Sequence, residues 1–222
     1  MRLIITGDPA LREIVLLSLE VSGVALIFAT IVGIPLGSFL GLTRFMGRRL
    51  VIALIYTGMG FPPVVVGLFV YLFLSRSGPL GPLGWLFTPQ AMVLAQIIIA
   101  FPLVAGFTMA AVMGVNPNLR RQVLSLGATD WQATWAILKE AKVGVVISII
   151  AGMGSIISEV GAVMIVGGNI EGSTRVLTTA IVLEVRQGVY DLAIALGIIL
   201  LLIGFIINFA MLQLQGRALD HD

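Results

Sequence analysis

Long apolar runs separated by short polar connections constrain this chain more than any other feature. A helix needs about 20 apolar residues to cross a bilayer. Five runs reach that length: residues 14–42, 50–74, 89–115, 143–166 and 189–214. Hydrophobic residues make up 59% of the 222-residue chain and charged residues only 11%, which is too little charge for the surface of a soluble domain. The sequence therefore predicts an all-α, polytopic membrane protein with about five spans, in one transmembrane domain over residues 1–222.

Several kinds of chemistry are absent from the sequence. It has no cysteine, which excludes disulfides and thiolate sites, and it has no Walker-type glycine loop, metal-binding cluster or Ser-His-Asp set. The one histidine, His221, lies between Asp220 and Asp222, and we interpret it as part of a solvated terminus and not as a metal ligand. We therefore expect no enzyme active site, metal site or cofactor in this chain. Energy for uphill transport would have to enter through a partner.

The positions of lysine and arginine predict how the spans are oriented, because these residues collect on the cytoplasmic side. Connections 43–49 and 116–142, with the C-terminal tail, hold eight of them, and the other side holds five, including Arg2. We therefore expect the N-terminus outside and the C-terminus in the cytoplasm. The net charge of +2 comes from a few loop arginines and does not indicate nucleic-acid binding. No signal-peptide cleavage site is evident, so we interpret the first run as a retained span.

The longest polar interruption, residues 116–142, predicts two short amphipathic helices. Apolar residues recur at helical spacing in both halves: Leu119, Val123 and Leu126, and then Trp131, Trp135 and Leu138. Gly127 suits a left-handed helix C-terminus, and Thr129 with Gln132 indicates a capping box that starts the second helix. We call residues 116–142 the elbow and expect it to be a surface that contacts a partner at the membrane face.

Proline and glycine interrupt two of the predicted spans. The second contains Pro62 and Pro63, and the third contains Pro102 and Gly106. Tandem prolines kink or break a helix, and in lipid the freed carbonyls are tolerated only where protein or a water-filled cavity meets them. Two interpretations stay open: these are packing kinks, or these spans line a translocation path on which Pro62 and Pro63 lie.

Glu159 is the most unusual residue of the fourth run, because a carboxylate at mid-span depth is costly unless it is paired, protonated or hydrated. Small residues that allow close helix packing recur four apart around it: Ser148 and Gly152, and Gly154 and Ser158. We assign Glu159 to helix packing or gating, and we include Ser155 and Ser158 in the candidate path. Glu20, nearer the boundary of the first span, is a weaker candidate.

A polar stretch, residues 167–188, follows the fourth run and returns towards the membrane. It opens with the turn signal Gly-Gly-Asn. One interpretation is an ordinary structured external loop, because loops are commonly polar and exposed. The other is an external gate or docking surface, for which Asn169 and Thr178 are candidates.

The chain resembles, over essentially its whole length, the permease subunits of ATP-binding-cassette (ABC) importers of the molybdate, sulfate and tungstate group. The elbow resembles the coupling loop of that family, with Gly127 in LGATDW as its glycine and Ile137 as its later apolar position. It departs from the family pattern at residues 121–123, where Glu-Ala-Ala would stand, and at residues 139–140, which replace Leu-Pro. The segment FPPVVVGLFVYLFLSRSGPLG is similar to oxyanion permeases in general, and SEVGAVMIVGGNIEGSTRVLTTAI is closer to tungstate permeases than to molybdate or sulfate ones.

This resemblance implies a type I ABC-importer permease fold with a cytoplasmic coupling helix, in the plasma (inner) membrane of a prokaryote. It implies a homodimer of permeases, two cytoplasmic ATPases that bind ATP and Mg²⁺, and an external oxyanion-binding protein. ATPase coupling would fall to residues of the elbow: Arg120, Arg121, Leu126, Gly127, Ala128, Thr129, Asp130, Trp131 and Trp135. The resemblance points to tungstate, with molybdate or sulfate as the alternatives. A competing class is an ion-coupled secondary transporter that uses Glu159 as a proton site.

Overall fold

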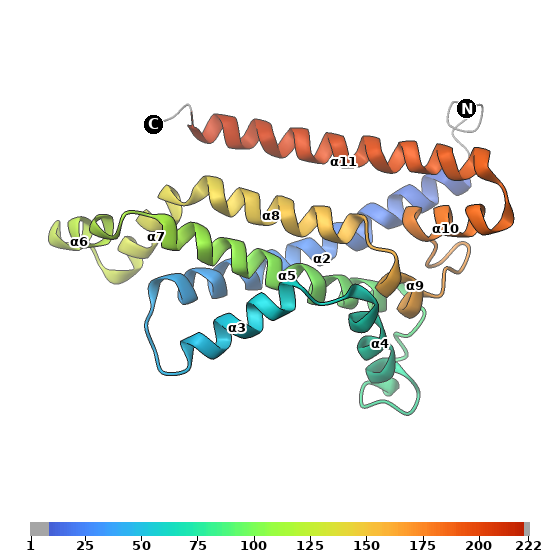
Figure 1. The fold of residues 1–222 in the computed structure, drawn as a ribbon, viewed down its shortest axis with the longest axis horizontal. Helices are drawn as coiled ribbons and strands as arrows, with labels where there is room; N and C mark the ends of the chain where they lie inside the picture. The colour runs from blue at the N-terminus through green and yellow to red at the C-terminus, as the bar shows by residue number, and fades with distance from the viewer. Residues whose placement is uncertain (1–8, 220–222) are drawn as a thin grey trace.

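The computed structural model describes residues 9–219, and within this range every regular element is a helix (Figure 1). Arg2 and the tail residues Asp220, His221 and Asp222 lie outside the described residues. The expected all-α architecture is therefore confirmed for the part of the chain that the structure describes. Some of these helices are long and continuous and others are sharply broken, and the candidate path residues lie at the breaks.

Three helices are long and apolar enough to cross a membrane: α2 (Pro9–Leu42), α5 (Pro89–Gly114) and α11 (Tyr190–Leu219). They correspond to the first, third and fifth predicted spans. Helix α5 continues through Pro102, whose ring lies where a side chain on Gly58 would otherwise stand. Pro102 and Gly106 thus pack α5 against the helix that contains Gly58, which agrees with the packing interpretation for these two residues.

The second predicted span is not a continuous helix. Helix α3 (Arg48–Met59) and helix α4 (Pro63–Leu74) meet at an angle of 102°. The break falls at Pro62 and Pro63, and Pro63 starts the new helix, where its missing N–H costs nothing. Counting this pair as one span, and likewise the bent pair of Asp130–Glu140 and Lys142–Ile157, brings the total of candidate spans among the described residues up to five by length and composition.

The fourth predicted span, residues 143–166, is also broken. Helix α8 (Lys142–Ile157) ends before Glu159, and a short helix α9 (Gly161–Gly167) follows it. Glu159 therefore lies in the break between two helices and not on the side of one. Side chains of α5 and α10 bind the backbone groups that this break frees, as the next section describes.

The remaining elements occupy the two ends of the molecule. The elbow forms helix α6 (Pro117–Ser125) and helix α7 (Asp130–Glu140), and α7 joins α8 at a bend of 68°. At the other end, a short 3₁₀ turn (Gly81–Leu83) lies in the connection between α4 and α5. Residues 167–188, which the sequence predicts to be a polar stretch, lie at this same end and contain helix α10 (Leu177–Gln187). The first residues of α10 are buried against α2 and α11.

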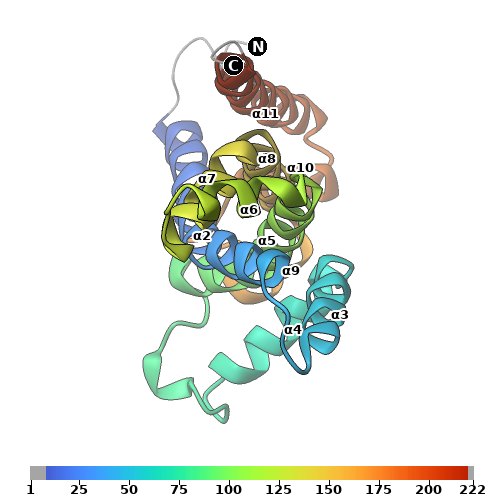
Figure 2. The same ribbon diagram turned by 90° about the vertical axis from the view of Figure 1, so that its left-hand side faces the viewer.

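Helix α5 is the centre of the bundle and packs against α2, α3, α4, α8 and α9. Viewed from the elbow end (Figure 2), α11 lies at one edge and α3 and α4 lie at the opposite edge. Three glycines of α2, Gly33, Gly37 and Gly41, face α5 so closely that a Cβ on any of them would approach an α5 atom within 3.0 Å. This spacing of four lets two long helices cross with their backbones almost in contact.

Candidate functional site

The elbow is a pair of capped helices, and the capping signals in its sequence are confirmed. Gly127 adopts φ +88°, and the N–H groups of Gly127 and Ala128 donate to the carbonyls of Leu124 and Val123. These two bonds form the Schellman end of α6. Thr129 then caps α7 in both directions: its Oγ1 accepts from the N–H of Gln132 at 3.3 Å, and its own N–H donates to that side chain at 2.8 Å.

Apolar side chains of the elbow are divided between two surfaces. Ile137 is buried with Val112 of α5, and Leu119 packs against the same cluster, so the root of the elbow is fixed to the bundle. By contrast Leu126 is 87% exposed, Trp131 75% and Trp135 55%. These three residues, which we call the apolar face of the elbow, form an exposed surface on two helices that are capped where they meet. Such a surface is typical of an interaction site.

Two charged residues of the elbow, Arg120 and Asp130, pair with each other. Arg120 Nη2 donates to Asp130 Oδ1 at 2.7 Å, so this ion pair links α6 to α7 within the chain. Both side chains are exposed enough for solvent to screen the pair, which limits its contribution to about 1 kcal/mol. Arg121, on the other hand, is exposed and makes no hydrogen bond or ion pair with another described residue.

A second cluster surrounds the break between α8 and α9. Glu159 is 9% exposed, and its Oε1 accepts from the N–H of Ala162 at 2.9 Å. The carboxylate therefore caps the N-terminus of α9, where the helix dipole favours negative charge. The carbonyl of Glu159 accepts from Thr178 Oγ1 at 2.8 Å, which ties α10 to the same point. Glu159 and Thr178, separate candidates in the sequence, are thus brought together.

Two further polar residues complete this arrangement and were missed by sequence reasoning. Gln96, buried on α5, donates to the carbonyl of Ile156 at 3.0 Å, and Thr174 donates to the carbonyl of Gly167 and accepts from the N–H of Ile170. They satisfy carbonyl groups at the C-terminal ends of α8 and α9, as burial requires. Gln96 could have been noticed as a lone amide within an apolar run, but its partner lies 60 residues away along the chain.

The other path candidates are distributed around this cluster. Pro63 begins α4, and the next residue, Val64, contacts α9 where a Cβ on Gly161 would stand, so both helix breaks lie near each other. Ser158 is exposed and bonds only to carbonyls of its own helix, and Ser155 is half-buried on α8. Asn169 lies beyond α9 with φ +53°, and its Oδ1 is buried without a hydrogen-bond partner among the described residues. Pro62 is exposed.

The capping role of Glu159 makes a prediction about stability. Glu159→Ala removes the acceptor for the Ala162 N–H and is expected to lower the free energy of unfolding by about 1 kcal/mol, within the range for lost helix caps. Glu159→Gln keeps an acceptor oxygen and is expected to lose less than half of that. Denaturant unfolding in detergent measures both, with Glu20→Ala, an exposed carboxylate of α2, as the control. Equal losses for the two Glu159 variants would contradict the cap.

Comparisons with known proteins agree with this architecture. The family described as the binding-protein-dependent transport system inner membrane component matches residues 33–219. The chain is 43% identical to a tungstate uptake system permease protein of Peptoclostridium acidaminophilum, over 97% of this chain and 94% of that one. It is 44% identical to a probable anion ABC transporter permease protein of Haloferax volcanii, over 93% and 91%. A molybdenum transport system permease protein of Escherichia coli is 29% identical, over 79% and 80%.

Solved structures share the fold. An inward-facing methionine ABC transporter, MetNI, matches with a TM-score of 0.78 over 94% of this chain and 95% of that chain, at 19% identity. A bacterial alginate ABC transporter in complex with a pentasaccharide-bound periplasmic protein matches with a TM-score of 0.74, over 92% and 78%, at 25% identity. The first likeness concerns the fold alone. The expected permease fold of ABC importers is confirmed.

Proposed function

Because the chain belongs to the family of binding-protein-dependent transport system inner membrane components, we propose that it is the transmembrane permease of an ATP-driven tungstate importer. Its identity to the tungstate permease is 43% over nearly the full length of both chains, against 29% for the molybdenum permease. The observation that carries the transport mechanism is the apolar face of the elbow, where two exposed tryptophans lie on a capped helix.

In this proposal the elbow docks into a cleft on a cytoplasmic ATPase, which binds the ATP and Mg²⁺. Leu126, Trp131 and Trp135 fill the cleft as apolar anchors. Arg121 forms a charged contact at the rim, while Gly127, Ala128 and Thr129 set the angle between the two elbow helices. The 68° bend between α7 and α8 then transmits a movement of the ATPase directly into the broken helix.

The assembly that we propose is a homodimer of this chain with two ATPases and an external oxyanion-binding protein. The elbow end, which also holds the arginines of residues 43–49, lies in the cytoplasm, following the bias in positive charge. Translocation takes place along the broken helices, at Pro62, Pro63, Ser155 and Ser158. Glu159, Asn169 and Thr178 lie at the outer half of this path. Breaking or forming the hydrogen bond by which Glu159 caps α9 opens or closes the path there.

The test is ATP hydrolysis by the permease, co-purified with its ATPase and reconstituted with its binding protein in liposomes. We expect the tungstate-loaded binding protein to stimulate hydrolysis more than the same protein offered molybdate or sulfate. Stimulation by another oxyanion alone would keep the mechanism and contradict the substrate. If no loaded binding protein changes the rate, the proposed importer function is wrong.

A further inference from the structure

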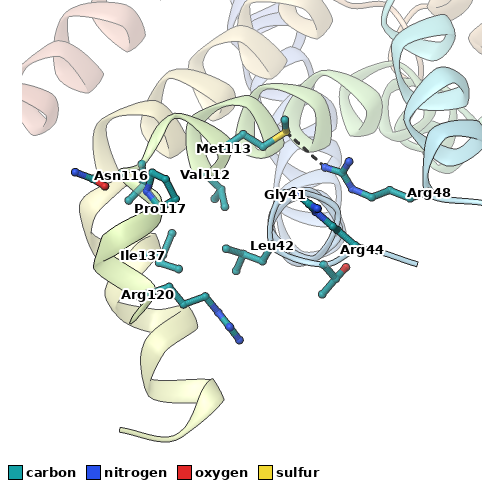
Figure 3. A pocket seen from close by; sticks show the side chains of 12 residues that line it. Gly41, Leu42, Arg44, Arg48, Val112, Met113, Asn116, Pro117, Arg120 and Ile137 are labelled. Carbon is teal, nitrogen blue, oxygen red and sulfur yellow. Dashed lines mark hydrogen bonds between the residues drawn. The ribbon is translucent and has the colours of Figure 1, made fainter. Parts of the chain in front are cut away.

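A cleft lies beside the root of the elbow, at the same end of the molecule as residues 43–49. It has a volume of about 370 Å³ and is enclosed by the C-terminal ends of α2 and α5 and the beginnings of α3 and α6. This is within the range of small-ligand sites. Figure 3 shows Arg44 and Arg48 on one side of the cleft and Arg120 with Ile137 on the other, and Leu42 lies between the two sides. We call it the arginine cleft.

The charge of the arginine cleft is unbalanced. Three arginines line it, and none of the lining residues is acidic. Arg44 makes no hydrogen bond or ion pair with another residue in the described range 9–219. Arg120 is partly neutralised by Asp130, but its Nε is buried and has no hydrogen-bond partner within that range. A buried donor without a partner is costly, so these groups favour an anionic ligand.

Arg48 is held in place by the fold. Its Nε donates to the carbonyl of Leu40 at 2.7 Å, and its Nη2 lies 3.7 Å from Met113 Sδ (Figure 3). The guanidinium is therefore fixed at the edge of the cleft, and its Nη1 makes no hydrogen bond with a described residue. A guanidinium N–H in a fixed position suits a charge-assisted hydrogen bond to a phosphate oxygen.

The remaining walls are apolar, which decides what kind of anion fits. Leu42, Val112, Val115 and Ile137 line the interior, and Phe45 and the fully exposed Met46 follow Arg44 in the adjoining connection. The cleft lies at the ends of membrane-spanning helices, the depth at which basic pockets meet lipid head groups. A phosphate group would contact the arginines while the rest of an esterified ligand contacts the apolar walls.

We propose that the arginine cleft binds a tetrahedral phosphate-like anion, either the head group of an anionic phospholipid or a free oxyanion. A bound anion would bridge the α2–α3 connection and α6, because Arg44 and Arg48 belong to the first and Arg120 to the second. It would thereby fix the elbow against the bundle. This site is separate from the two helix breaks of the proposed translocation path, which follow the far ends of α3 and α8.

Thermal unfolding of the full-length chain in lipid nanodiscs tests the proposal, since a ligand of the native state raises the unfolding temperature. One arm titrates inorganic phosphate against chloride at equal ionic strength in phosphatidylcholine discs. The other compares phosphatidylglycerol with phosphatidylcholine discs. Arg44→Gln is expected to weaken binding roughly tenfold, the loss of one charge-assisted contact. Arg49→Gln removes the same charge from the same connection but lies outside the cleft, and it should bind like wild type.

Stabilisation by phosphatidylglycerol alone would identify a lipid head group as the ligand, and stabilisation by phosphate would identify a free anion. Both results support the site if Arg44→Gln reduces the response and Arg49→Gln does not. The proposal is overturned if neither ligand stabilises the wild-type chain, or if the two variants lose the response equally. In the latter case only the general charge of the connection matters.

Discussion

The Trp131→Asp variant is expected to fold normally and to lose its ATPase partner. Trp131 is 75% exposed and contributes little to packing within the chain, so its replacement leaves the bundle intact. An aspartate in a desolvated apolar cleft removes an anchor and adds a buried charge. Loss of a tryptophan anchor costs about 2–4 kcal/mol of binding free energy, which corresponds to roughly 30- to 700-fold weaker association. Co-purification of the ATPase with the tagged permease measures this change.

Two controls separate docking from folding in that experiment. Trp131→Phe keeps an aromatic anchor and should retain most of the ATPase. Trp85→Asp makes the same substitution in the connection between α4 and α5, at the other end of the molecule, and should leave co-purification unchanged. If Trp131→Asp retains the ATPase as well as wild type, the apolar face of the elbow is not the docking surface.

The Gly37→Ala variant is expected to destabilise the whole bundle. A Cβ at Gly37 would come within 2.3 Å of the carbonyl oxygen of Ala105 and within 3.0 Å of the N–H nitrogen of Met109. These are backbone atoms of α5, so no side-chain rotation relieves the contact and the two helices must separate. Overpacking of this kind costs about 1–3 kcal/mol or more, a large part of the stability of a domain. Unfolding in detergent measures the loss.

The control for this prediction is Gly23→Ala, the same substitution in the same helix at a position with no atom within 4 Å. It should be neutral or slightly stabilising, because alanine favours a helix more than glycine does. A loss for Gly37→Ala no larger than that for Gly23→Ala would contradict the close α2–α5 crossing.

The elbow was predictable from the sequence because its signals are local. The left-handed Gly127, the capping box at Thr129 and the apolar spacing each depend on residues within one or two helical turns. These signals needed no knowledge of which helices touch.

The breaks in the helices were harder to predict because their compensation is non-local. The tandem prolines marked the α3–α4 break, but no proline marks the α8–α9 break. It is made possible by Gln96 and Thr178, which reach the freed backbone from other helices. Likewise, the glycines of α2 that face α5 are ordinary small residues in the sequence, and only the crossing geometry distinguishes Gly37 from Gly23.

The energy source of transport tests the central claim most directly. Proteoliposomes that contain the permease, its ATPase and its binding protein would be given tungstate outside and ATP inside, with and without a proton gradient. We expect uptake that requires hydrolysable ATP, is lost with Trp131→Asp and is unaffected when the gradient is collapsed. Uptake that follows the proton gradient without ATP, and is lost with Glu159→Gln, would contradict the account and make Glu159 the coupling site.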